Sequence, residues 1–379
     1  MNRKNILITG GAGFIGSNLT HKLIGKGYNV TVLDNLSTQI HGDNALLTSP
    51  LYLSIKDKVS FIKGTVTSKE DWQTAIKGQD IIVHFAAETG TGQSMYEIQK
   101  YVDVNINGTA IMLDILANST HNVKKIILAS SRSIYGEGKY LSKEFGPVYP
   151  KHRISNDMDM GDFEVKFQDS SFLKLVGTDE ESKIHPSSVY GITKQNQEQM
   201  IMTVCPTLGI SPVALRYQNV YGPGQSLKNP YTGILSIFST QIKNGNTLNI
   251  FEDGKETRDF VFIDDVVDAT ILGIERAEAD NKVYNVGTGV PIDVLTVAKS
   301  LILNYNISVP IVITGNYRLG DIRHNYADIT KIKIELGFQP KVNFNTGIKY
   351  FTEWVNTQDI EEDNYTYSIN EMKEKGLFK

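Results

Sequence analysis

The chain has 379 residues, a formal net charge of −4, 40% hydrophobic residues and 21% charged residues. This length allows one large α/β domain with a smaller lobe, and the apolar fraction argues against disorder. No basic block is present, so nucleic acid is a poor partner; the single cysteine, Cys205, excludes internal disulfides and cysteine-cluster metal sites. No apolar run approaches membrane-spanning length, and the start does not read as a signal peptide, so we expect a cytoplasmic protein with no membrane partner and no metal.

The first predicted element is a strand over residues 5–9, an apolar run that suits burial on both faces of a parallel sheet. A glycine-rich turn and a helix follow it. In this arrangement Gly10 permits the tight turn, Gly13 lets the backbone approach a pyrophosphate, and Gly16 lets the helix pack close to the strand. The helix N-terminus then offers free N–H groups and a partial positive charge to the phosphates.

The second predicted strand, residues 29–33, ends at Asp34. A carboxylate at this place can accept hydrogen bonds from both hydroxyls of the adenosine ribose, and it would repel a 2′-phosphate. The next residues, 35–38, contain no Arg or Lys. The pattern therefore predicts NAD as the cofactor in preference to NADP.

Strand-like and helix-like segments alternate through the first half of the chain, which predicts a Rossmann-type doubly wound parallel sheet. Further strands are expected at residues 59–64, 80–87, 125–131 and 213–217, and helices at 101–117 and from 188 to about 205. Residues 136–186 are polar and read as a surface insertion, with short alternation only over 163–167. We expect residues 1–220 to form the NAD-binding domain and 221–354 a smaller mixed α/β lobe with segments returning to the main domain. The tail, 355–379, is expected to be solvated.

Tyr190 and Lys194 have the spacing i and i+4, which places a phenol and an ammonium on one face of a helix. An adjacent ammonium stabilises the phenolate and lowers the tyrosine pKa, so the tyrosine can accept a proton from an alcohol while a hydride leaves to NAD. This spacing is common by chance. Its context is a predicted strand that ends in Ser130 and Ser131, and ligands of doubly wound sheets bind at the carboxyl ends of strands.

The chain resembles the extended short-chain dehydrogenase/reductases that act on nucleotide sugars, over roughly residues 4–354. The resemblance rests on ordered motifs at Thr9–Gly16, Asp34–Asn35, His84–Ala87, Val104–Thr109, Ser130–Gly136, Tyr190–Lys194, Leu215–Pro223 and Arg258–Val266. One departure is that the family usually has Gly-Asp after the third strand, with the Asp near the adenine, where this chain has Gly64-Thr65.

The resemblance implies that Tyr190 is the acid/base, Lys194 its partner and Ser131 the residue that orients the substrate. The implied cofactor-binding residues are Gly10, Gly13, Phe14, Ile15, Gly16, Asp34, Asn35, Val66, Phe85, Ala86, Ala87, Asn105, Ser130, Tyr190, Lys194 and Tyr217. The implied substrate-binding residues are Thr91, Gln93, Ser94, Ser131, Arg132, Ser133, Asn219, Arg258 and Arg318, with Asn219 at the nucleotide diphosphate and the last two as diphosphate clamps. Guanidinium forks suit phosphate oxygens independently of the resemblance. For Arg132 the sequence leaves open whether it binds a substrate group or turns outward.

Within the resembled family, dehydratases carry an acidic pair directly after the catalytic hydroxyl, where this chain has Arg132 and Ser133. A 4-epimerase, which oxidises C4, rotates the keto sugar and returns the hydride, needs no such pair. Residues 87–96 and 225–234 and the insertion resemble the subgroup of 4-epimerases that acts on dTDP-L-rhamnose.

Three alternatives stay open at this point: a UDP-hexose 4-epimerase (glucose/galactose or the N-acetyl forms), a nucleotide-sugar 4,6-dehydratase, and a catalytically silent NAD-binding regulatory protein. The expected partners are a dTDP- or UDP-sugar and a second copy of the chain in a homodimer.

Overall fold

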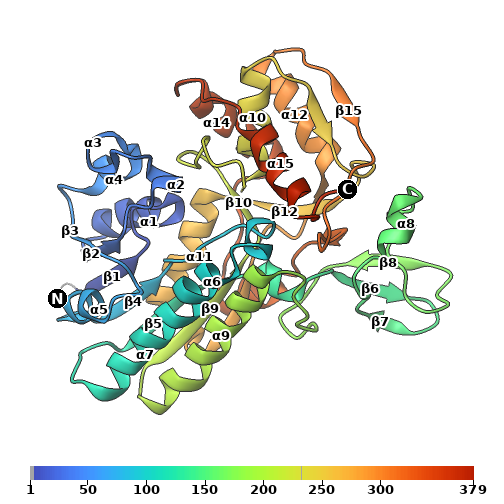
Figure 1. Ribbon diagram of the computed structural model, residues 1–379. Coiled ribbons are helices and arrows are strands. Elements are labelled where there is room, and N and C mark those ends of the chain that lie inside the picture. Colours follow the sequence, from blue (N-terminus) through green and yellow to red (C-terminus); the bar gives the residue numbers. More distant parts are fainter. Residues whose placement is uncertain (1–3, 232) are drawn as a thin grey trace.

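The computed structural model describes residues 4–231 and 233–379. Its centre is a seven-stranded sheet of order β13-β9-β5-β4-β1-β2-β3, in which all neighbouring strands run parallel (Figure 1). The strands are β1 Asn5–Thr9, β2 Asn29–Asp34, β3 Ser60–Lys63, β4 Ile81–His84, β5 Lys125–Ser131, β9 Ser211–Tyr217 and β13 Lys282–Val286. This sheet, with helices on both faces, confirms the predicted Rossmann-type fold.

Alternate residues of β1 explain how the sheet is covered on both faces. Ile6 and Ile8 belong to one hydrophobic core together with Leu19, whereas Leu7 belongs to the other together with Ile201. The first core is covered by α1 (Phe14–Gly25) and α11 (Ile263–Glu275), and the second by α5 (Lys69–Ile76), α7 (Gly108–Asn118) and α9 (Val189–Thr207). Continuous apolar strands follow from this two-sided burial.

Short elements connect the strands of the first half. They are α2 Thr38–His41, α3 Ala45–Thr48, α4 Pro50–Ile55, η1 Gln93–Met95, α6 Ile98–Tyr101 and η3 Arg132–Tyr135, with η4 Ala277–Ala279 later in the chain. The helix expected over residues 101–117 is divided: a π-helical stretch, η2 (Val102–Asn107), lies between α6 and α7. None of the helices in the described ranges is both long and apolar enough to cross a membrane.

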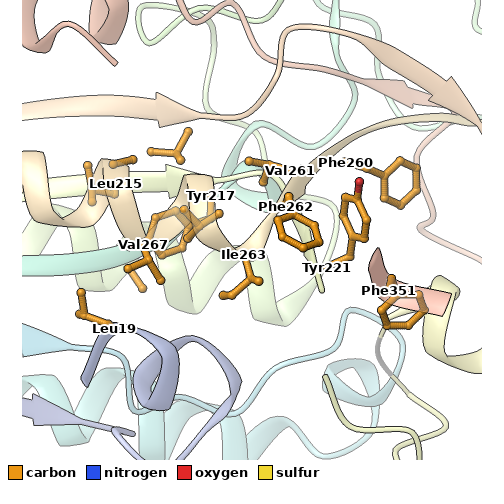
Figure 2. Close-up of a cluster of buried hydrophobic side chains, with 14 of the residues drawn as sticks. Leu19, Leu215, Tyr217, Tyr221, Phe260, Val261, Phe262, Ile263, Val267 and Phe351 are labelled. Atoms are coloured by element: carbon orange, nitrogen blue, oxygen red, sulfur yellow. The ribbon is translucent and has the colours of Figure 1, made fainter. Parts of the chain in front are cut away.

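The smaller lobe lies beyond the carboxyl ends of the central strands (Figure 1). Its elements are β10 Asn219–Tyr221, α10 Ile234–Lys243, β11 Leu248–Ile250, β12 Thr257–Phe262, β14 Pro291–Asp293, α12 Val294–Tyr305, β15 Ile311–Ile313, β16 His324–Asn325 and α14 Phe344–Val355. The helix α13 (Thr330–Leu336) returns to the main domain, where it packs against β13. Within the lobe, Tyr221 of β10 packs against β12 and α14, because its ring centroid lies 5.6 Å from that of Phe262 and 6.4 Å from that of Phe351 (Figure 2). Edge-to-face aromatic pairs of this kind add to the free energy gained from area burial.

The segment expected as a surface insertion forms an arm with a three-stranded antiparallel sheet, β6 (Lys139–Ser142), β7 (Gly146–Val148) and β8 (Leu173–Val176), and a short helix, α8 (Ser155–Asp159). In Figure 1 the arm projects from one side of the molecule. The alternation over residues 163–167 forms no strand, because Phe163 packs instead with Met158 and Tyr317. Arg153 of the arm donates both Nη groups to Glu252 of the lobe, at 2.6 and 2.7 Å.

The expectation of a solvated tail is wrong for its second half. Residues Tyr365–Glu374 form α15, and its Ile369 and Met372 are buried in one hydrophobic cluster with Phe378. On this helix Glu371 accepts hydrogen bonds at Oε2 from the hydroxyls of Tyr96, at 2.9 Å, and Tyr231, at 2.7 Å. The segment therefore joins a loop of the main domain to a loop of the lobe.

Candidate functional site

The turn between β1 and α1 has the geometry that its glycines predict. Gly10 has φ +68°, a conformation that side chains with a Cβ rarely adopt. A Cβ on Gly16 would lie 2.3 Å from the carbonyl oxygen of Gly10, so the helix approaches the strand closely because this position lacks one. A Cβ on Gly13 would meet only that same oxygen, at 3.2 Å. The space in front of Gly13 is open to a ligand, which is the cradle that a pyrophosphate requires.

Asp34 is fixed at the end of β2 by the backbone around it. Its Oδ2 accepts from the Ala12 N–H and its Oδ1 from the Leu36 N–H, both at 2.9 Å. Burial raises the pKa of this carboxyl, and the two backbone hydrogen bonds and the nearby His41 offset only part of that rise. Each carboxylate oxygen retains a lone pair for a ribose hydroxyl.

A cavity of about 350 Å³ runs along the carboxyl ends of the central strands from the glycine turn to Tyr190. Its wall includes fifteen of the sixteen expected cofactor residues together with the expected catalytic serine: Gly10, Gly13, Phe14, Ile15, Gly16, Asp34, Asn35, Val66, Phe85, Ala86, Ala87, Ser130, Ser131, Tyr190, Lys194 and Tyr217. The open cradle at Gly13, the fixed carboxylate and the apolar wall fit NAD. When bound, NAD would supply a hydride acceptor at the end of the cavity where Tyr190 lies.

Asn105 is the expected cofactor residue that does not line the cavity. It is completely buried on the π-helical stretch η2, where its amide accepts from the Glu88 N–H at 2.8 Å and donates to Thr193 Oγ1 at 2.9 Å. π-Helical turns often mark functional sites. Here the turn lets Asn105 tie the loop after β4 to the helix that carries Tyr190, so the side chain supports the cavity from behind.

The cavity wall also includes residues that were not among the expected cofactor or substrate residues: Gln39, Ile40, His41, Leu51, Thr65, Glu88, Thr89, Gln218, Val220 and residues 224–226. Most of them lie within ten residues of an expected site residue in the sequence. They belong to no pattern of spacing that would have identified them as wall residues. Thr65, where the family usually has Asp, is held by Asp71, whose carboxylate accepts from the Thr65 N–H at 2.8 Å.

The groups around Tyr190 come from α9 and from the end of β5. Ser188 caps α9 by accepting from the Gly191 N–H at 3.1 Å, which fixes the start of the helix directly before Tyr190. Burial raises the pKa of Tyr190, whereas a hydrogen bond with Ser131 and the charge of Arg132 lower it. Both neighbours therefore favour the phenolate.

Lys194 lies one turn further along α9 and is almost completely buried. Its Nζ donates to the carbonyl oxygen of Ala129 at 3.0 Å, and desolvation lowers its pKa to about 7. An ammonium in this position is costly unless an electron-rich partner approaches it. A ligand hydroxyl or the phenolate would provide that partner.

Six of the nine expected substrate residues gather next to this end of the cavity or in the lobe above it. Ser133 donates its hydroxyl to Ser131 Oγ at 2.9 Å, and the Nε of Arg132 donates to Asn219 Oδ1 at 2.8 Å. Arg258 pairs with Asp321 Oδ1 at 3.1 Å. The guanidinium of Arg318 lies 5.0 Å from the ring centroid of Phe251.

The other three expected substrate residues are directed elsewhere. Thr91 is exposed, Ser94 donates its hydroxyl to the Thr91 carbonyl at 2.7 Å, and Gln93 is bound by Gln39 and Tyr101. These contacts hold the loop after β4 in shape, and none of the three side chains lines the cavity.

Comparison with known proteins places the chain in a family. Residues 6–153 and 172–287 match the model of the NAD dependent epimerase/dehydratase family, so the chain belongs to that family. Among curated relatives, the dTDP-L-rhamnose 4-epimerase of Burkholderia thailandensis is 34% identical, over 95% of this chain and 97% of its own length. The putative UDP-glucose 4-epimerase of Methanocaldococcus jannaschii is 30% identical, over 92% of this chain and 98% of its own length.

A solved structure supports the same assignment. The UDP-glucose 4-epimerase of Thermotoga maritima, crystallised with UDP-glucose, is 31% identical and matches with a TM-score of 0.73 over 93% of this chain and 98% of its own. The family and the cavity together define an NAD-dependent enzyme of the nucleotide-sugar epimerase class.

Proposed function

We propose that this enzyme is a nucleotide-sugar 4-epimerase and that its substrate is dTDP-L-rhamnose. The observation that carries the reaction type is the segment of residues 131–133, at the end of β5 and the start of η3. It places Ser131, Arg132 and Ser133 beside Tyr190 and contains no carboxylate. A 4,6-dehydratase requires an acid and a base there to eliminate water, whereas a 4-epimerase requires only a group that takes a proton from the C4 hydroxyl and returns it.

Tyr190 takes the C4 hydroxyl proton in this proposal, Ser131 holds the same oxygen, and Lys194 stabilises the negative charge on the phenolate. When bound, NAD would supply the acceptor for the C4 hydride and its return to the opposite face of the turned sugar, while Tyr190 and Ser131 would hold the proton and the oxygen of C4. Protons and electrons balance, because the product is the C4 epimer and the enzyme regains its starting state.

Two carboxylates line the cavity, Asp34 and Glu88, and Asp34 is the expected ribose acceptor, so Glu88 is the one to consider for a different reaction. Its Oε2 lies 3.4 Å from the Nζ of Lys100, and Asn105 binds its backbone. This pairing supports a role in the cavity wall and not as a dehydratase acid.

The substrate rests on the Burkholderia relative and on the resemblance of residues 87–96 and 225–234 to its subgroup. UDP-hexoses are the second candidate, because the archaeal relative and the Thermotoga structure point to them. We also propose that residues 1–220 hold NAD and that 221–354 mainly hold the nucleotide.

The test is a product analysis by NMR. Purified protein with NAD is incubated separately with dTDP-L-rhamnose, UDP-glucose, UDP-N-acetylglucosamine and dTDP-glucose. We expect dTDP-L-rhamnose alone to be converted, to its C4 epimer; conversion of a UDP-sugar would replace the substrate, and a 4-keto-6-deoxy product from dTDP-glucose would refute the reaction type. Tyr190→Phe should abolish turnover and leave NAD binding intact, and activity in that variant would refute the role of Tyr190.

A further inference from the structure

Arg132 occupies an unusual place in the molecule. It is the first residue of η3, directly after Ser131, and its side chain is partly buried. The Nε donates to Asn219 Oδ1 at 2.8 Å. Within the described ranges this is the hydrogen bond that the guanidinium makes to protein, and neither Nη group has a protein acceptor.

The carboxylates close to Arg132 are engaged by other groups. Asp321 Oδ1 accepts from Arg258 at 3.1 Å and from the Ile322 N–H at 2.9 Å. Glu137 binds two backbone N–H groups, those of residues 323 and 324, at 2.7 and 2.8 Å, and the hydroxyl of Tyr140 at 2.8 Å. Both carboxylates act on Arg132 only at longer range, while Arg258 repels it.

Other buried arginines of this protein differ from Arg132 because each has a carboxylate partner. Arg216 is bound by Glu198 at 2.6 Å, Arg153 by Glu252 at 2.6 Å, and Arg323 by Asp253 at 2.7 Å. Burial and the charge of Arg258 lower the pKa of Arg132 to about 10, so it remains a cation at neutral pH. A partly desolvated cation without an anion is expensive, and a ligand anion would remove that cost.

The position of Arg132 indicates which part of a ligand carries the anion. The charge of Arg132 interacts with the phenol of Tyr190, where the sugar is expected to react. It also interacts with Arg258, which the resemblance implies is a diphosphate clamp. The bond from Nε to Asn219 fixes the plane of the guanidinium and leaves the two Nη donors for a pair of oxygen atoms. Two parallel N–H donors match the geometry of a phosphate.

We propose that Arg132 binds the β-phosphate of the substrate, the phosphate next to the sugar, as a third arginine of the diphosphate subsite beside Arg258 and Arg318. The proposal rests on the proposed nucleotide-sugar substrate. It assigns to Arg132 the task of holding the sugar at a fixed distance from Ser131 and Tyr190, since a single glycosidic oxygen separates the β-phosphate from the sugar.

The experiment compares nucleoside diphosphates with monophosphates and does not depend on turnover. Isothermal titration of the NAD-loaded protein measures the affinity for dTDP, UDP, dTMP and UMP in the unmodified protein and in Arg132→Gln, Arg132→Lys and Lys183→Gln. Lys183 is an exposed cation outside the site, so its variant removes the same charge as a matched control.

We expect Arg132→Gln to weaken binding of the tighter diphosphate by about 10- to 100-fold, the loss of a charge-assisted hydrogen-bond pair, and to leave monophosphate binding nearly unchanged. The diphosphate affinity of Arg132→Lys should lie between those of Arg132→Gln and the unmodified protein, and that of Lys183→Gln should equal that of the unmodified protein. An unchanged diphosphate affinity in Arg132→Gln would overturn the proposal and point to a sugar contact. An equal loss of affinity for diphosphates and monophosphates would also overturn it. The proposal would fail as well if both Arg132 variants had melting temperatures low enough to indicate misfolding. If the unmodified protein bound neither dTDP nor UDP, the proposed function would fail as well, whereas intact epimerisation with normal dTDP binding in Arg132→Gln removes only the role of Arg132.

Discussion

Gly16→Ala tests the link between close packing at the first turn and cofactor binding. The new Cβ would lie 2.3 Å from the Gly10 carbonyl oxygen, 2.6 Å from the Gly11 Cα and 2.9 Å from the Gly11 carbonyl carbon, all of them backbone atoms. Because ordinary contacts begin near 3.5 Å, the start of α1 must move by roughly 1 Å from the strand. Overpacking of this kind costs about 1–3 kcal/mol of unfolding free energy. The shift also displaces the N–H groups that we expect to face the pyrophosphate of NAD.

Gly25→Ala is the matched control, because Gly25 ends the same helix and a Cβ there would meet nothing within 4 Å. Alanine at this position should leave stability unchanged or raise it by up to about 1 kcal/mol. Urea denaturation of the NAD-free proteins gives the stability, and calorimetric titration with NAD gives the affinity. We expect Gly16→Ala to lose both stability and NAD affinity. If it behaved like Gly25→Ala in both measurements, the argument from close approach would be refuted.

Three further substitutions have expected outcomes. Lys194→Met should stabilise the NAD-free protein at neutral pH, because burial lowers the pKa of Lys194 to about 7. As pH rises from about 7 towards the pKa of Lys194 in the unfolded chain, near 10.5, the unmodified protein should gain stability relative to this variant by up to about 1.4 kcal/mol per pH unit. Urea denaturation at several pH values measures this, and a stability difference that does not change with pH would contradict it. Asn105→Ala should cost about 1–3 kcal/mol of stability and weaken NAD binding, because the Glu88 N–H loses its acceptor, and unchanged NAD titrations would exclude the supporting role. Glu371→Gln should increase hydrogen exchange in α15 while the central sheet keeps its protection, because the hydroxyls of Tyr96 and Tyr231 lose a charged acceptor. Equal exchange in α15 of both proteins would show that these two hydrogen bonds contribute little.

The sequence predicted the central sheet and the cofactor cavity because both depend on local patterns. Apolar runs define strands that are buried on two faces, and the spacing from Gly10 to Asp34 follows from the length of one strand-helix-strand unit. The prediction that Tyr190 and Lys194 lie on the same face requires only that residues 188–205 be helical.

Features that depend on distant partners were not predictable in the same way. The helix α15 was missed because Ile369 and Met372 are its few buried apolar residues within a polar segment, and their partners Tyr96 and Phe251 are far away in the chain. The role of Asn105 depends on a π-helical turn that no spacing rule indicates. Thr91, Gln93 and Ser94 lie on the expected loop, but side-chain direction in an irregular loop cannot be read from sequence.

The order of the strands also affects how the polypeptide folds as it leaves the ribosome. β13, the edge strand of the central sheet, is made of residues 282–286 and pairs with β9, which ends at residue 217. The chain between them builds β10, β11, β12 and α11 before it returns. Until then the backbone of β9 is an open sheet edge, which invites pairing with other chains, and such long-range closure is slow. A nascent chain halted near residue 220 would therefore be prone to aggregation.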